Sequence, residues 1–256
     1  HSLWAPVSGD FALFADAGTI YRLGGAGTVT PVATGFGSAG PVRYAEVNEA
    51  VYFTDGLRFG SYHPVPGPTP TWVSASPRSV GDQPLTPMPA GQHIAFRNGR
   101  LLVTVGAALI YSEPFTPHLR DEARGFELFP APITCLAAVE AGVIVVADKT
   151  YFAPGGFPAQ ELRAVLDYGA PEQQPSYSPD GSAHWMSARG VVVCSRGGEV
   201  ANVQEAHVAM KAEGQAATLY READGLRAIV AALSEPSSTG TGIGSYAQAR
   251  VIRKGA

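Results

Sequence analysis

The chain has 256 residues, of which only 16% are charged, while 30 are glycine and 21 are proline. This composition is typical of many short strands joined by tight turns, and it excludes a protein built mainly from long helices. A net charge of −4 argues against broad electrostatic capture of nucleic acid, and no apolar run approaches the ~20 residues that span a membrane.

The first 36 residues contain four short apolar runs, with turns near Gly9, Gly18 and Gly25. Runs of this length, rich in aromatic and β-branched residues and bounded by glycine, are typical of antiparallel strands. Residues 3–36 therefore predict one four-stranded unit. Because His1 already begins strand-like sequence, we expect further residues upstream in the natural protein.

Residues 41–75 repeat this pattern as PVRYAEVN, EAVYFTDG, LRFGSYHP and TPTWVSA. The turn at 47–49 and the Asp55-Gly56 pair are hairpin signals, because such turns need residues with positive φ. The segment predicts a second unit of four strands.

A proline-rich insertion, residues 64–91, runs out of this second unit and carries eight prolines. Because proline cannot donate to a strand ladder, we expect no central strand here, but an extended chain on the surface. The insertion is either a long linker or a strap against a neighbouring subunit. For the strap, the candidate contact residues are Pro66, Pro68, Trp72 and Arg78.

The clearest repeat lies at 93–130 and 133–165, where apolar strands alternate with polar or glycine turns. The inner runs, RLLVTVG and VIVVADK, contain the apolar stretches LLV and VIVVA, which indicates strands buried on both faces. The segment 115–125 is the most charged of the chain and predicts a solvated hairpin tip. Its candidate contact residues are His118, Arg120 and Arg124.

Two further units follow at 175–210 and 216–256. In the last unit, the loop at 236–245 reads PSSTGTGIGS and is a flexible tip by composition. Thr239 and Ile243 are its candidate contact residues.

Equivalent positions of the six units recur at spacings of 38, 52, 39, 42 and 42 residues, near Trp4, Val42, Ile94, Ile133, Pro175 and Ala217. A period of about 40 residues with four strands per unit predicts an all-β fold, a β-propeller. We expect a single domain, 1–256, of six blades of four antiparallel strands, with five or seven as alternatives. The expected blades span 1–39, 40–92, 93–131, 132–170, 171–211 and 212–256.

Few residues point to catalysis. The stretch from Ser178 to Trp185 resembles the Asp-box of sialidases, but Gly181 directly follows Asp180 instead of lying two residues on. We interpret it as a turn stabilised by the Asp180 side chain, with Trp185 as a packing residue. A sialidase would also need clustered arginines and a Tyr/Glu pair, whereas the arginines here are scattered along the units.

We identify no metal, cofactor or catalytic residues. The six histidines are far apart in sequence, unlike the close pairs of zinc sites. The glycines at 240–244 lack the following helix that would hold a dinucleotide. Cys135 and Cys194 lie inside apolar runs, so we expect two small buried side chains, although two cysteines also allow a disulfide.

The line RNGRLLVTVGAALIYSEPFTPH, followed by FELFPAPITCLAAVEAGVIVVADKTYFAPGG, resembles a family of tailed-bacteriophage virion proteins. The matching positions are Asn98–Leu101, Tyr111–Pro114, Ile133-Thr134, Gly142, Thr150–Phe152 and Gly155-Gly156. The later SARGVVVCSRGGEVANV and the opening SLWAPVSGDFALFADAGTIYRL are similar to other parts of the same pattern.

The resemblance implies a non-enzymatic structural β-propeller of the virion, in the tail, tail tip or neck. Such a protein would be a scaffold or adaptor, present in several copies, assembled in the host cytoplasm and bound to other virion proteins. A host surface receptor is a further candidate partner; no cofactor, nucleic acid or membrane insertion is implied. The alternative is a receptor- or glycan-binding propeller of the adhesin or lectin kind, and a sialidase-like glycosidase is the least favoured.

Overall fold

The computed structural model describes residues 2–6, 9–37, 40–48, 50–64, 79–80, 83–205, 208–209, 214–223, 226–234 and 250–253. Within these ranges the chain forms strands and no helix, as the composition predicts. Two compact units divide the chain, His1–Leu128 and Phe129–Ala256, and each is described by itself.

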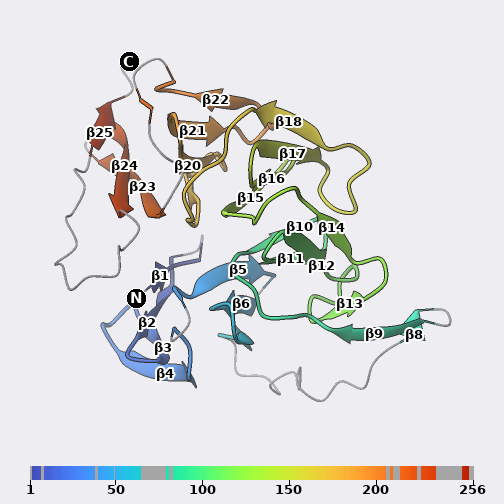
Figure 1. The fold of residues 1–256 in the computed structure, drawn as a ribbon. Coiled ribbons are helices and arrows are strands. Elements are labelled where there is room, and N and C mark those ends of the chain that lie inside the picture. The colour runs from blue at the N-terminus through green and yellow to red at the C-terminus, as the bar shows by residue number, and fades with distance from the viewer. Residues whose placement is uncertain are drawn as a thin grey trace, which may run out of the picture. The chain divides into compact units, whose positions relative to one another are not determined.

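The first unit contains three sheets whose strands follow one another mostly in sequence order (Figure 1). Their strands are β1 (Ser2–Trp4), β2 (Phe11–Asp16), β3 (Thr19–Gly24) and β4 (Val29–Thr34); β5 (Arg43–Val47), β6 (Ala50–Thr54) and β7 (Phe59–Tyr62); and β10 (Ile94–Arg97), β11 (Arg100–Val105), β12 (Ala108–Tyr111) and β14 (Phe126–Leu128). All the pairings are antiparallel.

The second unit repeats this arrangement with three more antiparallel sheets (Figure 1). Their strands are β15 (Cys135–Val139), β16 (Gly142–Val146), β17 (Thr150–Pro154) and β18 (Arg163–Leu166); β19 (Ser176–Tyr177), β20 (Ala183–Ser187), β21 (Gly190–Cys194) and β22 (Val200–Asn202); and β23 (Gln215–Ala223), β24 (Leu226–Ser234) and β25 (Arg250–Arg253).

Tight turns join neighbouring strands where the sequence places small or polar residues. Asn98 and Gly99 connect β10 to β11 with φ values of 49° and 73°, and Ala17 and Gly18 do the same between β2 and β3. Two successive positive φ values twist a two-residue turn in the sense that matches the flanking strands. Gly56, in the expected Asp55-Gly56 turn, also has a positive φ.

The second strand of several sheets is buried on both faces, as its apolar run predicts. Every residue of β6, β16 and β20 is buried. In the second unit one core cluster joins the β15–β18 sheet to the β19–β22 sheet around Trp185, Cys135 and Cys194, each with no exposed surface. Sheets in the first unit share two further cores in the same way.

The two cysteines form no disulfide and both are buried, which confirms their interpretation as small buried side chains. Burial raises the pKa of the Cys194 thiol to about 11. We therefore expect neither thiol to react with a disulfide reagent at pH 8 in the native protein, and both to react in concentrated urea. A thiol titration with and without urea checks this; rapid labelling of the native chain would contradict the packing of this core.

The proline-rich insertion departs from the expectation that it contains no central strand. Its described part forms β8 (Ser79–Val80) and β9 (Gln83–Pro87), and β9 lies between β8 and β13 (Leu119–Asp121). Met88 donates its N–H to the His118 carbonyl, so residues 86 and 88 direct their N–H groups toward β13. The backbone nitrogen of Pro87 therefore points toward β8 but lies past Pro84, the last β9 residue paired with β8. The backbone nitrogen of Pro84 points toward β13 but lies past Leu85, the last β9 residue paired with β13. Neither proline interrupts a ladder bond.

The segment 115–125 also differs from the solvated hairpin tip expected. Its central part is the strand β13, and Leu119 is only 1% exposed. The charged residues next to Leu119 in sequence give no sign of its burial. That burial comes from the partner strand β9, which belongs to the distant proline-rich insertion. The rest of the insertion, residues 65–78 and 81–82, lies outside the described residues, and so does the loop 236–245.

Candidate functional site

The two described segments expected to make contacts come together in one sheet. We call the three strands β13, β9 and β8 the accessory sheet, because it adds to the β10–β14 sheet without belonging to it. Figure 1 shows the β8–β9 hairpin projecting outward, with β13 beside β9. Since binding residues commonly sit on segments held by a rigid scaffold, the accessory sheet is the candidate functional site.

One face of the accessory sheet carries polar side chains that are partly buried. Arg120 lies directly opposite Thr86, and its guanidinium is 3.4 Å from the exposed carboxylate of Glu122. The Arg120 Nε and the Thr86 Oγ1 are both buried and make no hydrogen bond within the structure. Two neighbouring buried polar atoms without hydrogen bonds are uncommon in folded proteins, which makes this face a candidate contact surface.

The two other contact candidates of this segment differ in exposure. His118 is half-buried, and its backbone carbonyl holds β9 through Met88. Arg124 is exposed, and its backbone carbonyl accepts a 2.6 Å hydrogen bond from the Tyr111 hydroxyl. Burial is the main cause that raises the pKa of Tyr111, which keeps the phenol a donor. The Tyr111 bond thereby ties the charged segment to β12.

The remaining candidates lie outside the described residues. These are Pro66, Pro68, Trp72 and Arg78 of the insertion, and Thr239 and Ile243 of the last loop. Their assignment as contact residues stays a prediction.

Sequence reasoning missed one exposed residue beside the accessory sheet. Phe115 is 86% exposed and has a φ of 57°. A Pro-Phe pair gives no signal of a positive φ, because glycine or asparagine normally marks such a position.

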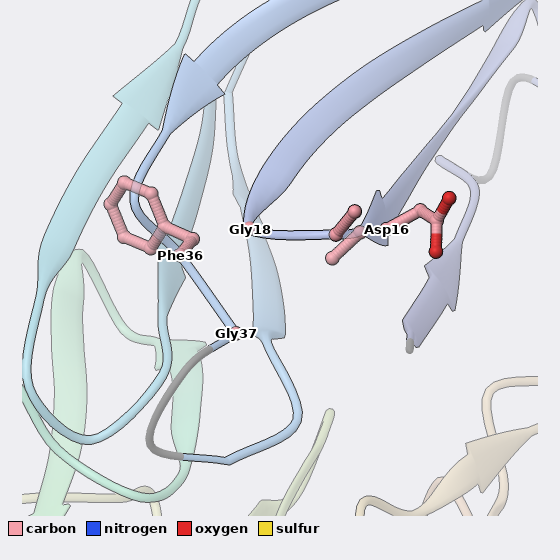
Figure 2. A pocket seen from close by; sticks show the side chains of 6 residues that line it. Asp16, Gly18, Phe36 and Gly37 are labelled. Carbon is pink, nitrogen blue, oxygen red and sulfur yellow. The ribbon is translucent and has the colours of Figure 1, made fainter.

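A small pocket of about 240 Å³ lies where the β2–β3 turn meets the segment after β4 (Figure 2). It is lined by Ala15, Asp16, Ala17, Gly18, Phe36 and Gly37. Figure 2 shows the Phe36 ring on one side and the Asp16 carboxylate turned away from it. The pocket is smaller than typical small-molecule sites, so we assign it no ligand.

The sialidase-like stretch is a structural turn, as interpreted from the sequence. The Asp180 carboxylate accepts hydrogen bonds from the Ser178 hydroxyl and the Ser182 N–H, and these bonds lower its pKa to about 2. Gly181 has a φ of 83°, which this turn requires. Trp185 is fully buried in the core.

Among the described residues, no three His, Cys, Asp or Glu side chains lie together in a way that could hold a metal ion. A search of the same residues finds no helix long and apolar enough to cross a membrane.

His184 makes the second unit sensitive to acid. Its ring is 4% exposed, stacks on Tyr220 at 5.5 Å and has a lowered pKa, chiefly because burial disfavours the charged form. An unfolded histidine has a pKa near 6.5, so below this pH the unfolded chain binds the proton more tightly. Stability is then fully present above about pH 6.5 and falls as the pH drops below it.

Urea unfolding at pH 7.5 and pH 5.5 checks this expectation, with His184→Phe as the comparison. The loss of stability between the two pH values should shrink in the variant. A smaller dependence of stability on pH will remain, because burial also lowers the pKa of His63 in the first unit. If the loss of stability between pH 7.5 and pH 5.5 were unchanged in His184→Phe, His184 would not be the cause of the acid sensitivity.

In the described part of the chain, these sheets define an all-β fold of repeated antiparallel units, several of which are built around an inner strand buried on both faces. No protein-family model matches the sequence, and no curated protein is detectably similar to it. Solved structures do match, at the level of the fold.

The AfRom2 CNH domain is similar with a TM-score of 0.53 at 9% identity, over 98% of this chain and 84% of that domain. The computationally designed Ika8 protein has a TM-score of 0.52 at 11% identity, over 91% of this chain and 67% of Ika8. The extracellular domain of a hybrid two-component system from B. thetaiotaomicron has a TM-score of 0.50 at 9% identity, over 88% of this chain and 30% of that one.

At these identities the likeness shows the fold alone. The CNH domain is propeller-like, and this chain accordingly has a β-propeller-like fold.

Proposed function

We propose that the chain is a non-enzymatic β-propeller of a tailed-phage virion, a tail or neck component that acts as scaffold or adaptor. The observation that carries the proposal is the accessory sheet, in which two segments predicted to make contacts pair with each other. The phage assignment itself rests on the sequence resemblance around Arg100–Pro114 and Ile133–Gly156.

The proposed architecture is six blades closed into a ring. Six sheets occur at the positions that the 40-residue period predicts, and four of them have four strands in the described part of the chain. Ring closure would protect the sheet edges, which otherwise invite aggregation. In this arrangement the accessory sheet is an addition to the third blade.

The scaffold role fits how the structure uses its buried polar side chains. Gln173, Thr54 and Ser112 each hold backbone groups of neighbouring segments. Such bonds make the sheets a rigid support for the accessory sheet. The two buried polar atoms of Arg120 and Thr86 that make no hydrogen bond mark the accessory sheet as the candidate contact surface.

Quantitative mass spectrometry of gradient-purified phage particles from the strain that encodes the chain tests the proposal. We expect its peptides at a fixed ratio to the major capsid protein, in the range of a tail component. Absence from the particles, with the protein free in the lysate, would contradict the proposal. Binding of that free protein to a glycan array would then favour the receptor-binding alternative.

A further inference from the structure

Phe115 occupies a turn position that normally belongs to glycine. The Thr116 N–H donates to the Glu113 carbonyl at 3.2 Å, which closes a four-residue turn with Pro114 and Phe115 at its centre. Phe115 has a φ of 57°, in the left-handed region. Proline second and a positive φ third are the marks of a type II turn, and a bulky side chain at the third position is strained.

The surrounding backbone holds the strained residue in place. The Phe115 N–H donates to the Gly99 carbonyl at 2.8 Å, and the Glu113 N–H donates to the Leu119 carbonyl at 2.8 Å. The aromatic ring lies against Gly99, where an added Cβ would come within 3.1 Å of the ring. The ring is therefore supported on one side by Gly99 and open to solvent over most of its surface.

The strained conformation adds little to the stability of the isolated fold, because 86% of the side chain is exposed. Strained backbone that persists in a rigid setting is characteristic of functional sites. Aromatic residues, phenylalanine included, are also enriched at the cores of protein interfaces. An ion pair between Arg100 and Glu113, 3.7 Å apart, lies beside the turn and supplies the polar surround of such an anchor.

We propose that Phe115 is the aromatic anchor by which the chain docks into an apolar pocket of a neighbouring virion protein. The inference rests on the proposed function and names its contact residue. Two features favour a protein pocket. The turn leads directly into β13 of the accessory sheet, and the outer strand β14 of the same blade exposes Phe126 and Leu128, at 39% and 66%.

The test compares phages that encode the unsubstituted chain, Phe115→Gly, Phe115→Trp and Leu57→Gly. Leu57 is the matched control, because it is also apolar, 72% exposed and in a turn of the first unit. Mass spectrometry measures the copies of the chain per purified particle, and thermal unfolding of each purified chain measures its stability. We expect Phe115→Gly to unfold at the same or a higher temperature, yet to be incorporated at least tenfold less.

Phe115→Trp keeps a ring and should be incorporated nearly normally, and Leu57→Gly should be incorporated normally. Normal incorporation of Phe115→Gly would overturn the anchor. If those normally assembled particles also failed to adsorb to host cells, the ring would instead contact a host-surface ligand. Absence of the unsubstituted chain from particles would overturn the proposed function itself, and the anchor with it.

Discussion

Replacing Gln173 by glutamate is expected to destabilise the second unit by about 3–5 kcal/mol at pH 7.5. Gln173 has no exposed surface. Its amide nitrogen donates to the carbonyls of Pro171 and Met186 at 3.0 and 2.6 Å, and its amide oxygen accepts the Met186 N–H at 2.8 Å. A carboxylate cannot donate, so it would place a buried charge against two carbonyl oxygens.

The position of Gln173 explains why the effect should spread beyond one strand. Its backbone N–H donates to the Thr134 carbonyl at 2.9 Å, at the start of the β15–β18 sheet, while its side chain holds β20 of the next sheet. One residue therefore joins two sheets of the second unit. The same glutamine-to-glutamate change at Gln215, an exposed residue of β23, is the matched control.

Urea unfolding followed by tryptophan fluorescence measures the difference. Gln173→Glu should lower the free energy of unfolding by the amount given, and Gln215→Glu by less than about 0.5 kcal/mol. A loss below about 1 kcal/mol in Gln173→Glu would contradict the described hydrogen bonds.

Replacing Thr54 by valine is expected to cost the first unit about 2–3 kcal/mol, although the two side chains have nearly the same shape. The Thr54 hydroxyl has no exposed surface; it donates to the Gly91 carbonyl at 2.8 Å and accepts the Gly91 N–H at 2.9 Å. Valine leaves both backbone groups of Gly91 buried without a partner. These groups lie just before β10, so the hydroxyl joins two neighbouring sheets.

Thr30→Val is the control, because Thr30 is exposed on β4 and valine suits a strand. Urea unfolding of both variants should separate them by about 2 kcal/mol or more. Equal stabilities would mean that water replaces the threonine hydroxyl, and the bond between the sheets would lose its significance.

The strands and the all-β class follow from the sequence because apolar periodicity and turn chemistry agree. The runs at 101–105 and 142–146 are almost entirely apolar, and both lie in strands buried on both faces; only Val105 of the two runs is exposed. The turn at Asp180 was also predictable, because the side-chain bonds that shape it are local.

The accessory sheet was not predictable, because it depends on which side of a strand each proline faces. That choice is set by the register of β9 against β13, and no local pattern encodes a register between distant segments. Arg120 was expected in a solvated tip for the same reason. Its burial comes from the strand opposite, not from its own neighbours.

No sequence pattern marks the roles of two further residues, Gln173 and Phe115. Gln173 sits between Pro171 and Pro175 in a short polar segment that reads as an ordinary linker. Its importance arises from the buried hydrogen bonds that it makes to two sheets. Phe115 follows a proline without any glycine, so the left-handed backbone has no signature in the sequence.

Cryo-electron microscopy of the intact particles tests the central claim most directly, since it reports closure, blade count and location together. The account predicts a closed six-bladed ring in the tail or neck, fitted by the six sheets, with density of another virion protein against Phe115 and the accessory sheet. An open chain of sheets, or particles in which no such density occurs, would contradict it.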